Sequence, residues 1–259
     1  PVAASDLPDQ EPVIGLEIDG DARAYPLRIL MWHEIVNDEV GGRPIAATYC
    51  PLCNAAIVFD RRVGDRVLAF GTTGKLRLSD LVMYDRETET WWQQFTGEAI
   101  VGALAGSALT MLPARLESFG RFRARHPDGR VLIPNDPTFR DYGRNPYVGY
   151  DTARAPFLFD GDLPETLPPM AYVVAVADRA WTLELLRASR EIVAGDLRLR
   201  WRDGAASALD APTVAAGRSI GDVTVERRGD DGQWRDAVYD LTFAFVFRAF
   251  RPDGAFVTE

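Results

Sequence analysis

A faint internal repeat is the sequence feature that most constrains the fold of this chain. Residues 11–30 (EPVIGLEIDGDARAYPLRIL) resemble residues 171–189 (AYVVAVADRAWTLELLRAS), and each segment combines an alternating apolar strand, a turn and a short amphipathic stretch. Residues 119–133 likewise resemble residues 245–257, and each of these segments contains a Pro-Asp-Gly triplet. A repeat of this length predicts two similar halves that pack together around a common core.

The local sequence favours strands over helices. Many segments are rich in β-branched and aromatic residues and are bounded by turn residues, which is typical of strands; examples are residues 13–18, 44–49, 55–63, 66–73, 80–86 and 241–247. Gly and Asp at 19–22, 41–44 and 62–66 predict hairpin connections. Only 27–38 and 114–126 have the spacing of short helices. We therefore expect an α+β fold that is mostly β, with two similar β-rich halves and a few short helices.

The composition suggests where the halves meet. Residues 135–170 are rich in Pro, Gly and Asp, as a linker or long loop would be. This predicts an N-terminal β-rich repeat over 1–134, a connecting loop region over 135–170, and a shorter, degenerate C-terminal repeat over 171–259 that packs on the first.

Both cysteines of the chain lie in the segment ATYCPLCNAAIVFD, residues 47–60. Proline fixes φ in the turn, and the Asn54 that follows Cys53 tolerates a left-handed backbone, so the segment predicts a tight knuckle with both sulfurs on one side. Such a knuckle can supply half of a tetrahedral metal site. It can also close into a disulfide and exchange with other thiols.

The two histidines, His33 and His126, lie in the same half as the cysteines, so this half carries all the soft ligands. A complete four-ligand metal site would use Cys50, Cys53, His33 and His126. If one histidine lay outside the coordination shell, one coordination position would stay open for catalysis. Both also have structural alternatives: His33 can bond a backbone carbonyl, and His126 precedes Pro-Asp-Gly at an expected helix end. Superposing the two Pro-Asp-Gly triplets places Arg251 opposite His126.

Other polar residues are candidates for lining such a site. The loop GTTGKLRLSD (71–80) lacks the phosphate-loop spacing and is better suited to contacting a substrate. The carboxylates after residue 83 alternate with aromatic residues, which is more typical of the solvated face of a hairpin than of an acid–base pair. The candidates are Glu34, Thr72, Thr73, Lys75, Arg77 and Asp85.

Three stretches carry a resemblance to a known family. These stretches resemble the DUF3179 family, whose function is unknown. They are residues 11–61, which contain the CPLC motif; residues 71–102; and the HPDG box at residues 126–129. The resemblance is strong over about residues 11 to 151 and weak in the last third. Members resemble exported bacterial and archaeal proteins, which implies a periplasmic, lipid-anchored or extracellular location. The family pattern usually has glycine after the second cysteine, where this chain has Asn54.

Charge and hydropathy exclude some functions. The net charge of −9 argues against nucleic acid as a partner. No apolar run approaches the ~20 residues of a membrane helix, and the start at Pro1 implies that any targeting leader has been removed.

The hypothesis is a cell-envelope metal-binding protein holding copper, zinc or iron, with a small molecule or an envelope protein as partner. A metal-dependent enzyme would need an open coordination position. The alternatives are a thiol–disulfide redox protein using Cys50 and Cys53, or a non-catalytic binding module with a structural disulfide.

Overall fold

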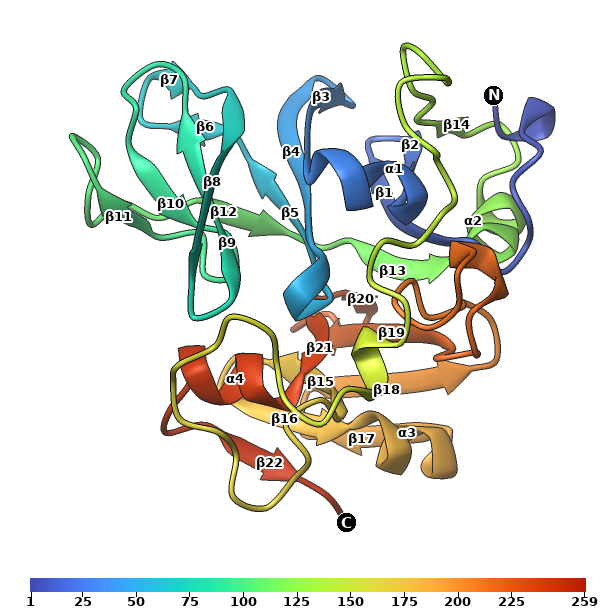
Figure 1. Cartoon of the computed structure of the whole chain (residues 1–259). Coiled ribbons are helices and arrows are strands. Elements are labelled where there is room, and N and C mark those ends of the chain that lie inside the picture. Colours follow the sequence, from blue (N-terminus) through green and yellow to red (C-terminus); the bar gives the residue numbers. More distant parts are fainter.

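The computed structural model describes all 259 residues and is an α+β fold in which strands predominate, as the sequence predicts. Figure 1 shows the elements of the N-terminal half, in blue to green, above those of the C-terminal half, in yellow to red. A shared core of 50 buried residues draws on both halves. No helix is long and apolar enough to span a membrane.

The first sheet has the order β13-β1-β2-β14 and is covered by two short helices. The tight turn at Asp19 and Gly20, both with positive φ, joins β1 to β2, so this predicted hairpin is confirmed. Helix α2 begins after Ser118, whose hydroxyl accepts a hydrogen bond from Arg121 N, and buries Phe119 and Phe122. The elements are β1 (Pro12–Ile18), β2 (Asp21–Pro26), α1 (Leu27–His33), β13 (Arg115–Ser118), α2 (Phe119–Arg125) and β14 (Arg130–Val131).

Two further four-stranded sheets complete the N-terminal half, with the orders β12-β5-β4-β3 and β11-β10-β9-β8. All their pairings are antiparallel, and the predicted hairpin at Gly41 and Gly42 joins β3 to β4. The elements are β3 (Ile35–Val40), β4 (Arg43–Cys50), η2 (Pro51–Cys53), β5 (Ala55–Asp60), β6 (Arg62–Val63), β7 (Arg66–Val67), β8 (Phe70–Arg77), β9 (Asp80–Asp85), β10 (Trp91–Gln93), β11 (Ala99–Val101) and β12 (Thr110–Leu112).

The C-terminal half contains sheets of order β21-β15-β16-β22 and β17-β18-β19-β20. The first of these has the same arrangement as β13-β1-β2-β14, including one parallel pairing at the end of the sheet. A common arrangement arises by duplication or by convergence, so the internal repeat and its boundaries stay a prediction. The elements are β15 (Tyr172–Val176), β16 (Arg179–Thr182), α3 (Leu183–Ser189), β17 (Glu191–Ala194), β18 (Leu197–Arg202), β19 (Asp222–Arg228), β20 (Trp234–Asp236), β21 (Asp240–Phe243), α4 (Ala244–Phe250) and β22 (Ala255–Val257).

Several predicted elements have different bounds in the structure, and the strands expected over 55–63 and 66–73 are each interrupted. The helix expected over 27–38 ends at His33, because Glu34 has φ +58° and the chain continues as β3. The helix expected over 114–126 begins only at Phe119, since the preceding residues pair with β1. The strand expected over 241–247 ends at Phe243, where α4 begins. Tertiary pairing and burial override the local pattern in each case.

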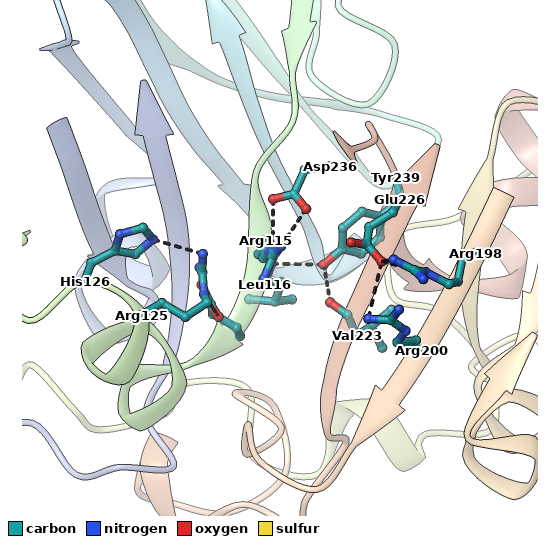
Figure 2. A network of polar contacts seen from close by, with 11 residues as sticks. Arg115, Leu116, Arg125, His126, Arg198, Arg200, Val223, Glu226, Asp236 and Tyr239 are labelled. Carbon is teal, nitrogen blue, oxygen red and sulfur yellow. Dashed lines mark hydrogen bonds and ion pairs between the residues drawn. The ribbon is translucent and has the colours of Figure 1, made fainter. Parts of the chain in front are cut away.

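The two halves are joined by polar contacts as well as by the core. Arg115 at the start of β13 forms an ion pair with Asp236 of β20. The Tyr239 hydroxyl accepts a hydrogen bond from Leu116 N and donates one to Val223 O (Figure 2). Residues 135–170 contain no strand and only the one-turn helix η3 (Tyr150–Thr152).

Candidate metal centre

The predicted knuckle forms where β4 gives way to β5. Strand β4 ends at Cys50, Pro51–Cys53 form one 3-10 turn, and Asn54 takes the left-handed conformation with φ 49° and ψ 33°. Asparagine thus fills the role expected of glycine at this position. Both cysteines are free thiols and both are buried.

The tip of the β8–β9 hairpin lies against the two thiols. Its two turn residues, Leu78 and Ser79, have φ of +53° and +66°. Glycine or asparagine usually occupies such a turn, so these residues hold the backbone in a strained conformation. The turn directs the Ser79 carbonyl toward the knuckle, where it accepts from Cys53 Sγ at 3.5 Å and lies 3.8 Å from Cys50 Sγ.

Asp80, the next residue, brings a carboxylate to the thiols. One of its carboxylate oxygens and the sulfurs of Cys50 and Cys53 all lie within 4.8 Å of one another, and all three residues are buried. Its Oδ2 accepts from Gln93 Nε2 at 2.5 Å and from Phe95 N at 2.8 Å. Its Oδ1 is buried and has no hydrogen-bond partner.

Burial makes all three groups reluctant to ionise. It raises the pKa of Asp80 to about 6, against the opposing effect of the hydrogen bonds from Gln93 and Phe95. Burial also raises the pKa of both thiols, and the pKa of Cys53 rises further because the interaction between the two thiols opposes the shift at Cys50 and adds to it at Cys53. A cation bound among the three would reverse this balance, because it stabilises the deprotonated forms.

The C-terminal half holds the knuckle in place. The Asn54 side-chain amide donates to Leu241 O at 2.8 Å, and the Thr242 hydroxyl donates to Cys53 O at 2.7 Å. Both partners belong to β21, so the position of the thiols depends on contacts across the two halves. The sequence predicts that this half packs on the first and does not indicate these contacts.

A segment of the connecting region covers the hairpin tip and the knuckle from another side. The Tyr150 hydroxyl donates to Leu52 O at 3.1 Å, and the Ser79 hydroxyl donates to Phe157 O at 2.6 Å. These bonds bring residues 150–157 over the centre. The thiols are consequently enclosed by three separate segments of the chain.

The structure does not bring His33 to the thiols. This residue is exposed at the end of α1, its Nε2 lies 2.7 Å from the Tyr142 hydroxyl, and its ring is stacked with Phe139. No group of potential ligands includes His33. Its assignment as a ligand stays a prediction.

His126 also lies apart from the cysteine cluster. It follows α2, packs against Phe122, and its Nε2 accepts from Arg125 Nη1 at 2.9 Å (Figure 2). Partial burial and the adjacent Arg125 lower the pKa of His126. His126 does lie at the end of α2, where the sequence places it, and its role as a ligand stays a prediction.

The remaining candidates differ in their relation to the centre. Burial and then the charge of Asp80 raise the pKa of Glu34, which places Glu34 in electrostatic reach of the cluster. Arg77 donates to Gln93 Oε1 at 3.2 Å and so connects, through Gln93, to Asp80. Asp85 accepts from Trp92 and Thr88 and stabilises a turn.

The other three candidates lie along β8. Thr72 and Lys75 are exposed, and the half-buried Thr73 donates its hydroxyl to Val82 O at 2.6 Å. The register of β8 with β9 shifts between Thr72 and Lys75, so the strand bulges at this point. None of the three has a contact that relates it to the thiols.

The sequence alone does not identify Ser79 and Asp80, whose carbonyl and carboxylate oxygens lie beside the thiols. Both residues lie at the end of the loop GTTGKLRLSD, residues 71–80. The one available signal was an aspartate between an expected hairpin turn and an apolar strand. That position commonly belongs to a turn residue, so it does not indicate a buried carboxylate.

The donor set is chemically suited to a transition metal. Two thiolates and one carboxylate match zinc, which accepts sulfur and oxygen ligands in a tetrahedral arrangement. The unpartnered Oδ1 of Asp80 is a buried acceptor for which a cation would be a natural partner. Three protein ligands would leave a fourth position for water or a substrate.

Comparison with known proteins gives a family and no function. The family model described as "Protein of unknown function (DUF3179)" matches residues 1–254. No curated protein and no solved structure matches the chain. Because the match covers nearly the whole sequence, the chain belongs to the DUF3179 family.

Proposed function

We propose that Cys50, Cys53 and Asp80 form a metal-binding centre in a protein of the cell envelope. The observation that carries the proposal is the convergence of three ligand atoms within 4.8 Å in a buried site, one of them belonging to a carboxylate with an unpartnered oxygen. The two thiolates suit copper(I), zinc and iron, whereas the added carboxylate favours zinc.

Binding would couple metal affinity to the ionisation of the cluster. The thiols and Asp80 must lose their protons to coordinate the ion, and burial holds the pKa of each above its ordinary value. Gln93 and Phe95 N hold Oδ2 of Asp80 and leave Oδ1 free to face the ion. The envelope location is supported by the family resemblance, and an open fourth position would permit a small-molecule substrate.

The test is elemental analysis of untagged protein purified without chelators and under mild reductant, with free thiols counted on the same sample. We expect about one metal ion per chain and thiols protected from alkylation. Asp80→Asn should weaken zinc binding by about tenfold or more, since loss of even an outer partner costs that much. Asp253→Asn changes an exposed aspartate and serves as the matched control. Metal-free protein with reactive thiols would refute the proposal.

A thiol–disulfide protein is the second candidate. Its supporting observation is the carboxylate of Asp80 beside both thiols, with a pKa of about 6 that suits a proton acceptor near neutral pH. Closing the Cys50–Cys53 bond would release two protons and two electrons to an external oxidant. Protein without metal, with a bridge that opens and closes at a measurable potential, would support this candidate. A bridge resistant to reductants, with function kept in a double Cys→Ser variant, would indicate the non-catalytic binding module.

A further inference from the structure

A cleft of about 490 Å³ lies between the two halves and is lined in part by Phe95. This volume falls within the ordinary range of small-molecule sites. The backbone N–H of Phe95 donates to Asp80, while the residue also lines the cleft, so the cleft adjoins the cluster. Its lining includes the apolar residues Phe95, Met111 and Phe247 and the charged residues Asp240 and Arg251.

Most residues that line the cleft are apolar or already form hydrogen bonds or ion pairs with other residues. Figure 2 shows that Asp236, which lines the cleft, is paired with Arg115, and that the Tyr239 hydroxyl is bonded to two backbone groups. Arg227 forms an ion pair with Asp196. These partners leave only two charged side chains of the cleft without an ionic partner.

The two remaining charges are Asp240 on β21 and Arg251 after α4. Oδ1 of Asp240 is buried and accepts no hydrogen bond. The guanidinium of Arg251 has one hydrogen bond, from Nη1 to Phe250 O, so its other N–H groups remain available. No ion pair within 4.0 Å joins the two residues, although Arg251 does lower the pKa of Asp240 against the effect of burial.

We propose that this cleft binds a small zwitterionic molecule with an apolar side chain, such as an amino acid, with its amine at Asp240 and its carboxylate at Arg251. Asp240 is half-buried, so an amine would pair with the part of its carboxylate that faces the cleft, and a carboxylate can form two parallel hydrogen bonds with a guanidinium. The apolar body would contact Phe95, Met111 and Phe247. The site uses none of the three proposed metal ligands and stands independently of the metal proposal.

The test compares three probes that share one hydrocarbon skeleton: L-leucine, 4-methylpentanoate, which lacks the amine, and isopentylamine, which lacks the carboxylate. Calorimetric titration of the full chain, up to about 10 mM probe, should show binding of L-leucine and at least tenfold weaker binding of the other two. L-methionine and L-phenylalanine extend the panel to other apolar side chains.

Variants identify the site. Asp240→Asn and Arg251→Gln should each weaken binding of the zwitterion at least tenfold, whereas Asp253→Asn and Arg248→Gln, nearby and outside the cleft, should leave it unchanged. Circular dichroism verifies that each variant is folded, and Arg251→Gln provides the test if Asp240→Asn does not fold. Absence of binding by all three amino acids, or binding that neither cleft variant weakens, would overturn the proposal.

Discussion

Replacing Asp240 with asparagine should remove a loss of stability that the protein otherwise suffers as the pH rises. Burial raises the pKa of Asp240 from 3.8 to about 7, with Arg251 opposing the shift and Asp80 adding to it. Between pH 3.8 and about pH 7, Asp240 is therefore protonated in the folded protein and ionised in the unfolded chain. The stabilisation is complete below pH 3.8 and is lost as the pH rises to about 7.

The size of the effect follows from the shift. About three pKa units at about 1.4 kcal/mol each give a change on the order of 4 kcal/mol in the free energy of unfolding. Asp240→Asn should gain stability relative to the wild type by up to that amount between pH 4 and pH 7, and then show a constant difference. Any effect of the amide on packing would add an offset that does not vary with pH.

Urea unfolding of both proteins at several pH values measures this difference. Asp80 also titrates in this range, so the wild-type slope alone is not informative, and the comparison with the variant isolates Asp240. Asp253→Asn, which changes an exposed carboxylate, should follow the wild type at every pH. A constant difference between Asp240→Asn and wild type from pH 4 to pH 8 would show that Asp240 is ionised in the folded protein and would refute the reasoning.

Substitutions at three positions test the local structure by urea unfolding at pH 7. Asn54→Ala should cost about 3 kcal/mol, since it removes two side-chain hydrogen bonds and leaves a left-handed alanine, and Asn54→Gly about 1 kcal/mol less; equal losses would contradict the backbone argument. Ser118→Ala should cost about 1–2 kcal/mol by removing the cap of α2 and the bond to Asp222. Tyr239→Phe should cost about 2 kcal/mol, because Leu116 N and Val223 O lose their partner. A loss below 0.5 kcal/mol in either of the last two would indicate that water replaces the side chain.

Features set by neighbouring residues could be predicted from the sequence. The knuckle is one, because proline and a residue tolerant of positive φ dictate the turn within five residues, and Asn54 does adopt that conformation. The hairpin at Gly41 and Gly42 is another, for the same reason. The mostly β character follows from side-chain composition, which is also local.

The ligand set could not be predicted, because it depends on which distant segments meet. Asp80 reaches the thiols through a hairpin whose turn residues, Leu78 and Ser79, are poor formers of such a turn, so its geometry is imposed by the surrounding fold. Histidine suits a metal site by its chemistry, but chemistry does not determine position: His33 is held at the surface by Tyr142 and Phe139. Burial of a carboxylate and exposure of a histidine are both tertiary outcomes.

The placement of charge argues that the C-terminal half contributes to function as well as to packing. A half that served only to cover a core would gain nothing from Asp240, since a buried carboxylate without a partner destabilises the fold. Arg251 is near enough to lower the pKa of Asp240 and yet is not paired with it, so a titratable acid and a cation lie unpaired in one largely apolar cleft. The adjacent Leu241 and Thr242 also fix the cysteine knuckle. One strand, β21, therefore supports the proposed metal centre and the proposed ligand cleft.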